Sequence, residues 1–600
     1  MTTLLRLPWL HPLLLLVWLV IGIGLRLTNL TAKPPWTDEF STLVFSLGNS
    51  FLPVPLNQPI SVDVLLQPLQ PITATGIKDV WTHLITESNH PPLYFVLAHW
   101  WMQLFPTEGG LVSLWGARSL AALFGGASIP AIYALSWLAF RSRLVSQLAA
   151  AMMATSPYGI FLAQEARHYS LAILWVIASL ACLVIATRHI QNRTQLPIWV
   201  VLSWVGINAL GIATHYFFTL TLCAEAFVLI FLGWQIRGDK GKGNSGYSKG
   251  IRGQGRERES KRVGEVEEIS STSPIPTPPL FSPWLRIYAV AVGTSVAGLV
   301  WLPVFLHSKN GGQLTEWIQG PRVGMAWLNP LFQAFAAWLT MIYLLPVEAS
   351  QLSIIIASGL VMLAFLIWGS PILVSGLREQ LSQPQNRLMT QVFGGLILGA
   401  ITLFFIFTYF FNIDLTRGAR YNFVYFPAVI VLVGASLAVC WNFKGSTRRW
   451  GISGKKSVAI IWLMGFLSAI TVICNLGYQK YYRPDLFVQL IEQTSHVPVL
   501  ISTIEKTHVQ IGEMMGVARE FKIHNSTFPS PKFLLLHQGK NPSSTTALQD
   551  ILKLLPRPLD LWLVNFYTSM PAEVKNCTAD THSLPAVNGY EYKLYHCLEK

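Results

Sequence analysis

The feature that most constrains this chain is a series of apolar stretches, each long enough to cross the roughly 30 Å hydrocarbon layer of a membrane. Eleven such stretches lie at residues 9–29, 115–140, 144–163, 169–187, 196–214, 216–236, 286–306, 351–373, 390–411, 420–441 and 457–477. Charged residues make up only 12% of the 600 residues, against about 25% in soluble domains. The sequence therefore predicts a polytopic α-helical membrane protein.

Two further apolar stretches are ambiguous, because residues 91–106 are short and residues 325–346 are broken by Pro330. If both lie on the outer surface as juxtamembrane helices, every strongly basic short loop falls on one side of the membrane, as the positive-inside rule requires. The basic residues of these loops are Arg141, Arg143, Arg188, Arg193, Arg378, Arg387, Lys444, Arg448, Arg449, Lys455 and Lys456. We therefore expect about eleven spans, with thirteen as the alternative, a cytoplasmic N-terminus and an outer C-terminus. A bacterial plasma membrane is the expected location.

The composition divides the chain into four predicted parts. Residues 1–236 form an N-terminal membrane bundle, whose first outer loop is residues 30–114. Residues 237–285, rich in Gly, Ser, Pro and charged residues, are expected to be a disordered basic cytoplasmic linker. Residues 286–477 form a second membrane bundle. Residues 478–600, in which short apolar runs alternate with polar stretches, are expected to form a small α/β domain outside the membrane.

Charge and cysteine content exclude some classes of protein. The net charge of +14 lies mostly in loops between apolar spans, where it sets orientation, so we expect no nucleic-acid partner. The sequence contains no CxxC pair and no His/Cys cluster that would indicate a metal site. Cys577 and Cys597 lie in the predicted outer domain, where they form either a disulfide or two free thiols.

Two adjacent carboxylates follow the first span, in the segment Trp36-Thr37-Asp38-Glu39-Phe40-Ser41. One interpretation is a helix start, with Thr37 or Asp38 as the N-cap. The other is a catalytic carboxylate at the membrane surface. An Asp-Glu pair is also able to hold a divalent metal ion, although no cofactor is certain from the sequence.

Several cationic and aromatic residues are expected at the same membrane face as this pair. His90 precedes Pro91-Pro92 at the end of the same outer loop, where the two prolines restrict the backbone. Each of the arginines by itself is interpreted as an interfacial anchor; together they are typical of a phosphate site, because a guanidinium group binds phosphate through two hydrogen bonds. The residues in question are Arg118, Arg167, Tyr169, Arg420 and Tyr421.

The order of these motifs resembles that of the GT-C glycosyltransferases, and within them the protein O-mannosyltransferase and aminoarabinose transferase group. It runs from Asp38-Glu39 through His90-Pro91-Pro92-Leu93-Tyr94 and Arg118-Ser119-Leu120 to Gln164-Glu165-Ala166-Arg167-His168-Tyr169. The resemblance covers roughly residues 5–440 and implies a GT-C fold with a polyprenyl-phosphate sugar as donor. Tyr94-Phe95 stands where the protein mannosyltransferases have Gly-Lys, which favours the broad bacterial branch over protein mannosylation.

The resemblance also implies a role for each site residue. Asp38 would be the acidic residue at the reacting centre, with Glu39 beside it. His90, Arg118, Arg167, Tyr169, Arg420 and Tyr421 would bind the donor and its lipid phosphate. The expected function is transfer of a single sugar to a lipid, glycan or protein acceptor among membrane lipids. The alternatives are a transporter or flippase of a lipid-linked glycan, for which Glu225 in mid-span is the main candidate residue, and a non-catalytic scaffold.

Overall fold

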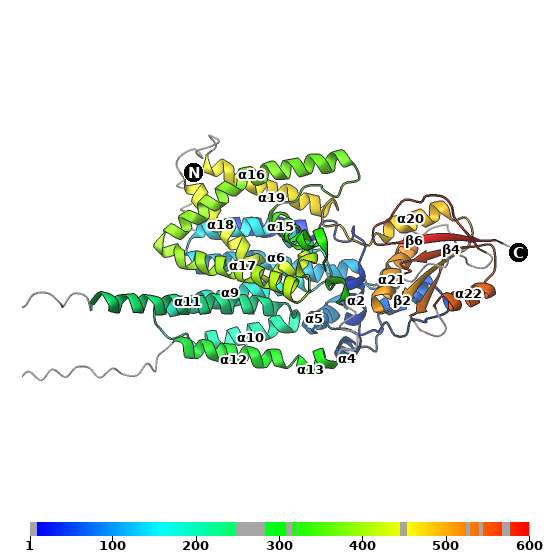
Figure 1. Ribbon diagram of the computed structural model, residues 1–600, viewed down its shortest axis with the longest axis horizontal. Helices are drawn as coiled ribbons and strands as arrows, with labels where there is room; N and C mark the ends of the chain where they lie inside the picture. Colours follow the sequence, from blue (N-terminus) through cyan, green and yellow to red (C-terminus); the bar gives the residue numbers. More distant parts are fainter. Residues whose placement is uncertain are drawn as a thin grey trace, which may run out of the picture.

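A computed structural model describes residues 9–247, 283–307, 315–320, 322–443, 453–523, 529–538, 544–566 and 577–598. Most of the predicted 237–285 linker lies outside the described residues, as do Lys444, Arg448 and Arg449 of the predicted cytoplasmic loops. In the described part of the chain, a helical bundle occupies one end of the molecule and a β-sheet domain the other (Figure 1).

In the described part of the chain, eight helices are long and apolar enough to cross a membrane. Seven of them lie within α1 (Leu10–Leu27), α6 (Leu114–Phe140), α9 (Tyr169–Gln191), α11 (Phe218–Tyr247), α16 (Leu352–Ser382), α17 (Pro384–Phe410) and α19 (Gly454–Ile473). The eighth, Trp284–Val304, begins in α12 (Pro283–Leu299) and extends beyond its end. Three further apolar helices are shorter, namely α5 (Leu93–Met102), α10 (Ile198–Thr214) and α18 (Phe426–Asn442). The predicted class, a polytopic helical membrane protein with a small C-terminal sheet domain, is confirmed.

Some predicted stretches differ from the helices observed. The stretch 144–163 consists of two helices, α7 (Arg143–Thr155) and α8 (Pro157–Ala163), because Pro157 has no N–H to continue the first helix. The stretch 286–306 is divided between α12 and the short α13 (Leu302–His307). The two ambiguous stretches form α5, of 10 residues, and α15 (Asn329–Ile342), of 14 residues. At 1.5 Å per residue, both are too short to cross the hydrocarbon layer.

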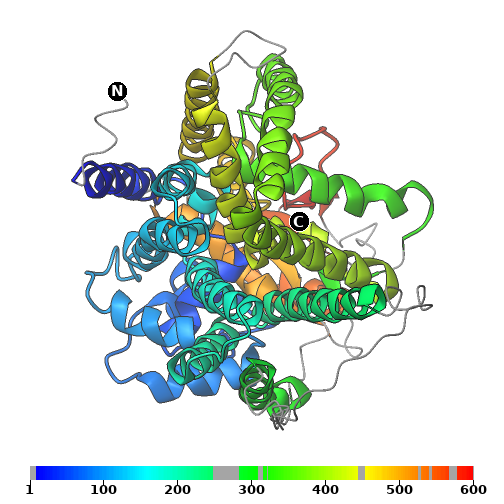
Figure 2. The same ribbon diagram turned by 90° about the vertical axis from the view of Figure 1, so that its left-hand side faces the viewer.

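The first outer loop forms a layer between the bundle and the sheet domain (Figure 1). It contains α2 (Thr37–Ser46), β1 (Pro59–Ser61), α3 (Val62–Leu65), α4 (Ile77–Glu87) and α5. From this layer α6 runs for 27 residues, about 40 Å, to the far end of the bundle. Figure 2 looks onto that far end, in a direction nearly parallel to the axes of many of the bundle helices. Arg141 and Arg143, which follow α6, thus lie far from the sheet domain.

The C-terminal domain contains a six-stranded sheet with the order β1-β3-β2-β4-β6-β5. Its strands from this part of the chain are β2 (Val499–Glu505), β3 (Lys532–His537), β4 (Leu559–Val564), β5 (Thr578–Ala579) and β6 (Tyr592–Cys597). β2 pairs in parallel with β3 and β4, while the other pairs are antiparallel. Cys577 and Cys597 form a disulfide beside β5 and β6.

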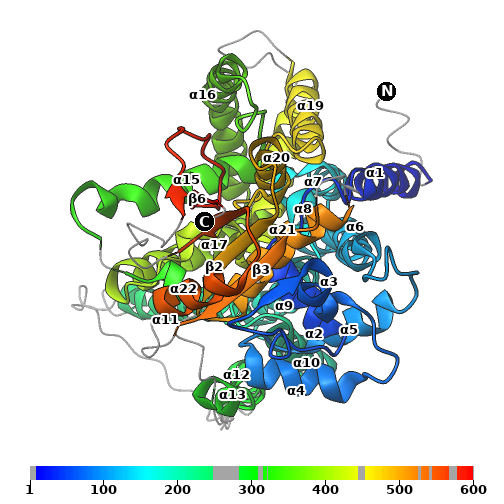
Figure 3. The ribbon, with the colours of Figure 1, turned by 90° about the vertical axis from the view of Figure 1, so that its right-hand side faces the viewer.

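Helices cover both faces of this sheet (Figure 3). Ile501 and Phe533 belong to the same core as residues of α20 (Pro484–Thr494) and α21 (His508–Ile523). Their neighbours Leu500 and Leu534 belong to a second core with residues of α22 (Ser544–Leu554). Because successive residues of a strand point to opposite faces, the central strands β2 and β4, covered on both sides, are buried along their whole length.

The first outer loop and the C-terminal domain share one hydrophobic core, although the sequence analysis treated them as separate parts. β1 of the loop is an edge strand of the sheet, with Ile60 opposite Phe533. Phe40 of α2 lies in the same core as Met514 of α21. A Cβ atom at Gly512 of α21 would lie 3.7 Å from the Thr37 backbone, so the two helices approach closely there. The C-terminal domain thus rests on the helix that carries the two predicted carboxylates.

Candidate active site

The first turn of α2 carries both carboxylates. The residue before this helix, Trp36, has extended backbone angles and its side chain makes no capping hydrogen bond. The interpretation of Thr37 or Asp38 as the N-cap is therefore wrong, since both already lie within the helix. Negative charge in a first turn is favoured by the helix dipole. Adjacent helical residues point about 100° apart, so Asp38 and Glu39 enter different surroundings.

Glu39 forms a fully buried ion pair with Arg118, and neither side chain is exposed. Arg118 Nε donates to Glu39 Oε1 and Nη2 donates to Oε2, both at 2.8 Å. The backbone N–H of Ala166 donates to Glu39 Oε1 at 2.8 Å. Burial by itself would raise the pKa of Glu39, but the charge and hydrogen bonds of Arg118 outweigh it and lower the pKa to about 2. Glu39 is therefore a buried, fully engaged carboxylate.

Arg118 contacts protein groups, whereas the sequence predicted a contact with the lipid phosphate. Its Nη1 donates to the carbonyl oxygens of Leu30 and Lys33 at 2.8 Å each, so all three of its nitrogens are engaged. These contacts connect α6 to the segment after α1 and to α2. A lipid phosphate would have to displace Glu39 to reach this guanidinium group. Arg118 thus holds the frame of the site, in place of the predicted phosphate contact.

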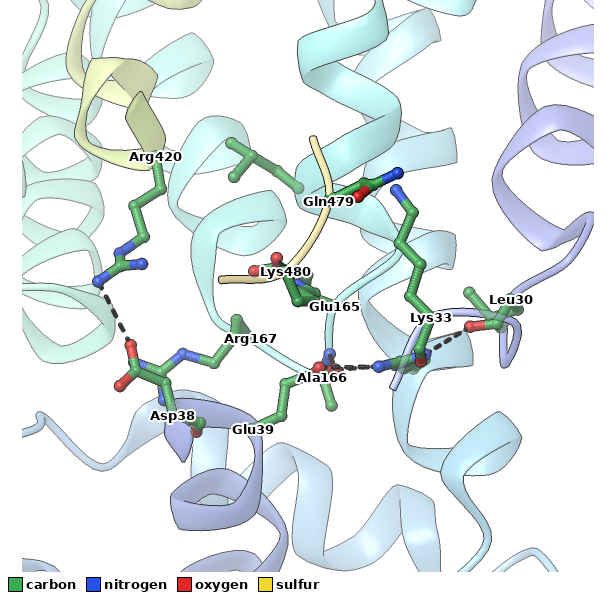
Figure 4. A network of polar contacts seen from close by, with 12 residues as sticks. Leu30, Lys33, Asp38, Glu39, Glu165, Ala166, Arg167, Arg420, Gln479 and Lys480 are labelled. Carbon is green, nitrogen blue, oxygen red and sulfur yellow. Dashed lines mark hydrogen bonds and ion pairs between the residues drawn. The ribbon is translucent and has the colours of Figure 1, made fainter. Parts of the chain in front are cut away.

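Asp38 lies on the open side of the same turn, with 30% of its side chain exposed. Its Oδ2 atom is 3.6 Å from Arg167 Nη2 and 3.6 Å from Arg420 Nη2. Figure 4 shows the Asp38 carboxylate between these two side chains, with Glu39 turned away toward Ala166. Both ion pairs are longer than a direct charge-assisted hydrogen bond of about 2.7–2.9 Å. The structure therefore brings together three of the predicted residues, from distant parts of the sequence, around an accessible carboxylate.

Arg167 is held in place by several contacts. Its Nη1 donates to the Asp38 carbonyl at 2.8 Å and to Thr42 Oγ1 at 2.9 Å. Its Nη2 lies 2.9 Å from Nε2 of His90. Because a guanidinium group only donates, Nε2 must accept, which leaves the His90 proton on Nδ1, 2.9 Å from Ser88 Oγ. Burial, and then the charge of Arg167, hold the pKa of His90 well below its usual value. His90 thus orients Arg167 as a neutral imidazole.

Arg420 is the more available of the two cations beside Asp38. Its guanidinium carbon lies 4.5 Å from the Trp36 ring centroid and 5.1 Å from that of Trp317. The ring of Tyr421 is 5.5 Å away. The Nε atom of Arg420 has no hydrogen-bond partner. Stacking between aromatic rings holds the plane of a guanidinium group without using its N–H donors, so the Nε donor stays unpartnered.

A wall of imidazole and aromatic rings adjoins Arg167. The His168 ring centroid lies 4.5 Å from that of His215 and 4.8 Å from that of Tyr169. Tyr169 itself is buried, with its ring 5.9 Å from the guanidinium carbon of Arg167. Both ring nitrogens of His168 lack hydrogen-bond partners. Burial, and then the nearby His215, hold the pKa of His168 well below its usual value. The wall is therefore uncharged at neutral pH apart from Arg167.

Sequence reasoning missed the contribution of Lys480, which follows the last membrane helix. Its ammonium group forms an ion pair with Glu165 and lies 5.3 Å from the Trp36 ring centroid. Lys33 is buried nearby, where burial and then the charge of Lys480 lower its pKa to about 7. Figure 4 shows Lys33, Glu165 and Lys480 together beside the Glu39 end of the network. In the sequence, a lysine among tyrosines after a span is typical of an interfacial anchor, so no signal separated it from one.

His508 is a second missed residue, and it comes from the C-terminal domain. It begins α21, and its ring stacks on Phe51 with a centroid distance of 5.2 Å. Burial lowers the pKa of His508 to about 4, against the opposing charge of Asp38. The sheet domain therefore contributes a neutral imidazole to the surroundings of Asp38.

The candidate site does not fit the divalent metal ion that the sequence allowed. The described residues contain no group of three or more His, Cys, Asp or Glu side chains with metal-binding geometry. Both oxygens of Glu39 are engaged by Arg118, and Asp38 is flanked by two guanidinium groups. Neither carboxylate is in surroundings that favour a second cation.

Comparison with known proteins gives only distant matches. No family model and no curated protein sequence matches this chain. One similar solved structure is ArnT from Cupriavidus metallidurans bound to undecaprenyl phosphate, with 12% identity, 98% of each chain covered and a TM-score of 0.48. Another is the oligosaccharyltransferase AglB from Archaeoglobus fulgidus in complex with an inhibitory peptide and a dolichol-phosphate. It has 12% identity and a TM-score of 0.41, and the match covers 93% of this chain and 69% of that chain.

Both neighbours belong to the GT-C superfamily, which is the group that the motif order resembles.

Proposed function

We propose that this chain is a glycosyltransferase that moves a single sugar from a polyprenyl-phosphate donor to an acceptor at the outer face of the membrane. The observation that carries the proposal is the accessible Asp38 carboxylate between Arg167 and Arg420. This cluster lies at the end of a bundle whose described residues include eight helices apolar enough to span a membrane. An acidic residue next to two cations at that level suits a sugar linked to a lipid phosphate.

In this mechanism the arginines bind the phosphate and the carboxylate binds the acceptor. The bond between sugar C1 and the phosphate oxygen breaks, and its electron pair stays on the phosphate. The acceptor oxygen or nitrogen forms the new bond to C1, and its proton passes to Asp38. Arg420, with its unpartnered Nε, and Arg167 stabilise the charge that develops on the leaving phosphate. A single displacement of this kind inverts the configuration at C1.

His90 and Glu39 act on this reaction through other residues. His90 accepts a hydrogen bond from Arg167 and so fixes the direction of that guanidinium group. Glu39 and Arg118 fix the first turn of α2 on which Asp38 is placed. Both are therefore positioning residues in the proposed reaction.

The proposal is tested by the release of labelled sugar from polyprenyl-phosphate hexoses and pentoses. The wild-type protein is expected to transfer or slowly hydrolyse one of these donors. Asp38→Asn, which keeps the size of the side chain but removes the base, is expected to slow release about 10²–10⁴-fold. Full activity of Asp38→Asn would exclude the proposed role of this carboxylate.

Glu225→Gln is the matched control and also addresses the transporter alternative. Glu225 is buried within the bundle, where it accepts a hydrogen bond from Ser179 Oγ at 2.8 Å. We expect this variant to release sugar at close to the wild-type rate. Donor binding without release, equal in wild type and Asp38→Asn and unchanged by an acceptor-containing membrane extract, would favour transport over transfer.

A further inference from the structure

A cavity of about 790 Å³ opens where the last membrane helix meets the C-terminal domain. Its walls come from residues 348–350, from residues 474–476 at the end of α19, from residues 479–481 with Arg483 and Leu486, and from Asn588. Its volume is within the roughly 300–1,000 Å³ typical of ligand pockets. None of the residues around Asp38 described above lines this cavity except Lys480.

Lys480 and Trp36 form the partition between this cavity and the candidate active site. Lys480 lines the cavity and its ammonium group lies 5.3 Å from the Trp36 ring centroid. Arg420, which reaches Asp38, stacks on the same ring at 4.5 Å. Figure 4 shows Gln479 and Lys480 on one side of the network and Asp38 with Arg420 on the other. The cavity therefore adjoins the reacting centre across the side chains of the partition.

The charges of this cavity are already compensated. Lys480 pairs with Glu165, and Arg483 pairs with Asp485 at 2.6 Å. Glu348 is an exposed carboxylate, one oxygen of which accepts from the Gln479 backbone N–H at 2.7 Å. Each cation that lines the cavity therefore already has a carboxylate partner among the described side chains. An anionic ligand is disfavoured, because it would meet Glu348 without a free positive partner.

The remaining lining groups suit a ligand with many hydroxyl groups. Tyr481 is 73% exposed, and its ring lies edge-on to Tyr482 with a centroid distance of 5.2 Å, which fixes it as a flat apolar platform. The side chains of Ser350 and Asn588 are exposed beside it. Amide, hydroxyl and carboxylate groups donate to and accept from sugar hydroxyls, and an aromatic ring packs against the C–H face of a sugar.

We propose that this cavity binds an uncharged glycan, namely the carbohydrate portion of the acceptor. The designation as acceptor rests on the proposed glycosyl transfer, whereas the binding of neutral carbohydrate rests on the cavity alone. The partition of Lys480 and Trp36 then separates the part of the acceptor that is recognised from the hydroxyl that reacts at Asp38.

The test is saturation-transfer NMR on the full-length protein in phosphatidylcholine nanodiscs, which contain no sugar. The probes are the neutral trisaccharides maltotriose, cellotriose and chitotriose, with trigalacturonic acid as the acidic counterpart. We expect transfer to at least one neutral trisaccharide and at least five-fold less to trigalacturonic acid. Absence of transfer to all three neutral probes, or stronger transfer to the acidic one, would overturn the proposal.

Variants locate the binding to this cavity. Tyr481→Ala is expected to reduce the signal at least five-fold, and Asn588→Ala about two-fold, whereas Tyr481→Phe keeps the platform and most of the signal. Thermal unfolding of each variant is expected to match the wild type, because both side chains are exposed. An unchanged signal in Tyr481→Ala would place the binding elsewhere and overturn the proposal.

Two further measurements separate this proposal from the proposed function and from the other source of carbohydrate. Asp38→Asn is expected to bind the trisaccharide as the wild type does, so loss of sugar release with retained binding affects only the proposed function. A polyprenyl-phosphate sugar added in excess is expected to leave the trisaccharide signal unchanged. Displacement of the trisaccharide by that lipid would show that the cavity holds the donor, and would overturn the acceptor assignment.

Discussion

Asp38 and Glu39 are neighbours in one helical turn, yet the two sides of that turn are built in opposite ways. On the Glu39 side the ion pair with Arg118 is unexposed, has two hydrogen bonds of 2.8 Å and includes a third from the backbone of Ala166. On the Asp38 side the carboxylate is 30% exposed, and the nearest atoms of its two arginines are 3.6 Å away.

The comparison distinguishes charges that stabilise the fold from charges that a substrate is able to contact. A buried ion pair with ideal geometry recovers its desolvation cost only while both partners stay together, so no substrate is able to use it. A looser, partly exposed cluster exchanges its partners with little loss. The adjacent residues thus suggest a division of work, in which Glu39 holds the turn and Asp38 meets the substrate.

The largest effect that tests this division is expected on stability. Glu39→Gln leaves the Arg118 charge buried without a partner, and we expect it to lower the free energy of unfolding by about 3–5 kcal/mol. Asp38→Asn is expected to change it by no more than about 1 kcal/mol. Both are measured by unfolding in mixed micelles with an increasing fraction of denaturing detergent, followed by circular dichroism. Equal losses in the two variants would remove the distinction between the two sides.

The same pair predicts how this stability depends on acid. Because the pKa of Glu39 is lowered from 4.5 to about 2 in the folded protein, its contribution is complete above pH 4.5 and is lost as the pH falls toward 2. The difference between the wild type and Glu39→Gln is therefore expected to shrink over that interval. A difference that stays constant down to pH 2 would mean that folding does not lower the pKa of Glu39.

The next effect concerns the phosphate contact on the open side. Arg420→Lys keeps the charge but loses the planar group that stacks on Trp36, and we expect it to raise the KM for the donor about ten-fold with a smaller change in kcat. The control is Arg417→Lys, since Arg417 is exposed and pairs with Asp414 away from Asp38. Steady-state kinetics over a range of donor concentrations separates the two parameters. An effect of the same size in both variants would argue against a specific phosphate contact.

The smallest effect is a pH dependence on the open side, which sets in at a higher pH than the acid dependence of the Glu39 pair. Burial lowers the pKa of His508 to about 4, so below pH 6.5 the unfolded chain binds a proton that the folded chain does not. His508 is therefore expected to contribute a fall in stability of about 1 kcal/mol by pH 5.5, and His508→Phe, which keeps the stack on Phe51, is expected to lose this component.

Adding Asp38→Asn sharpens the same measurement, because Asp38 is the charge that favours a protonated His508. Its removal is expected to enlarge the loss of stability in acid. Identical pH profiles in wild type, His508→Phe and the Asp38→Asn variant would show that this imidazole does not sense the site.

The sequence predicted the membrane fold well because its signal is local. Apolar length identifies a span without knowledge of its neighbours. The prediction failed where apolar length and helix continuity disagree. One apolar stretch is divided at Pro157 into α7 and α8. Strand β1 was missed for another reason. Its three residues gain their partner from β3, far away in the sequence, and no local pattern encodes that pairing.

The site was predicted as a group of residues rather than as an arrangement. Asp38, Arg167 and Arg420 come together as a cluster, and the motifs placed all three at one membrane face. Arg118 carries the same charge at the same level of the membrane, yet it is internal, because Glu39 and two carbonyls engage it. Which arginine is available to a substrate depends on the partners that already engage it, and the residue type alone does not reveal those partners.

The pairing of β1 with β3 has a consequence for how the protein is made. Lys532 leaves the ribosome ~470 residues after Ser61, its partner in the sheet. At the usual rate of synthesis this delay is roughly 25–90 s. For most of that time the loop with Asp38 is already across the membrane in the proposed orientation, but α21 and His508 do not yet exist. An incomplete chain released by a stalled ribosome would thus carry Asp38 without α21 and His508. Such a fragment would be inactive only if the reaction at Asp38 requires the C-terminal domain.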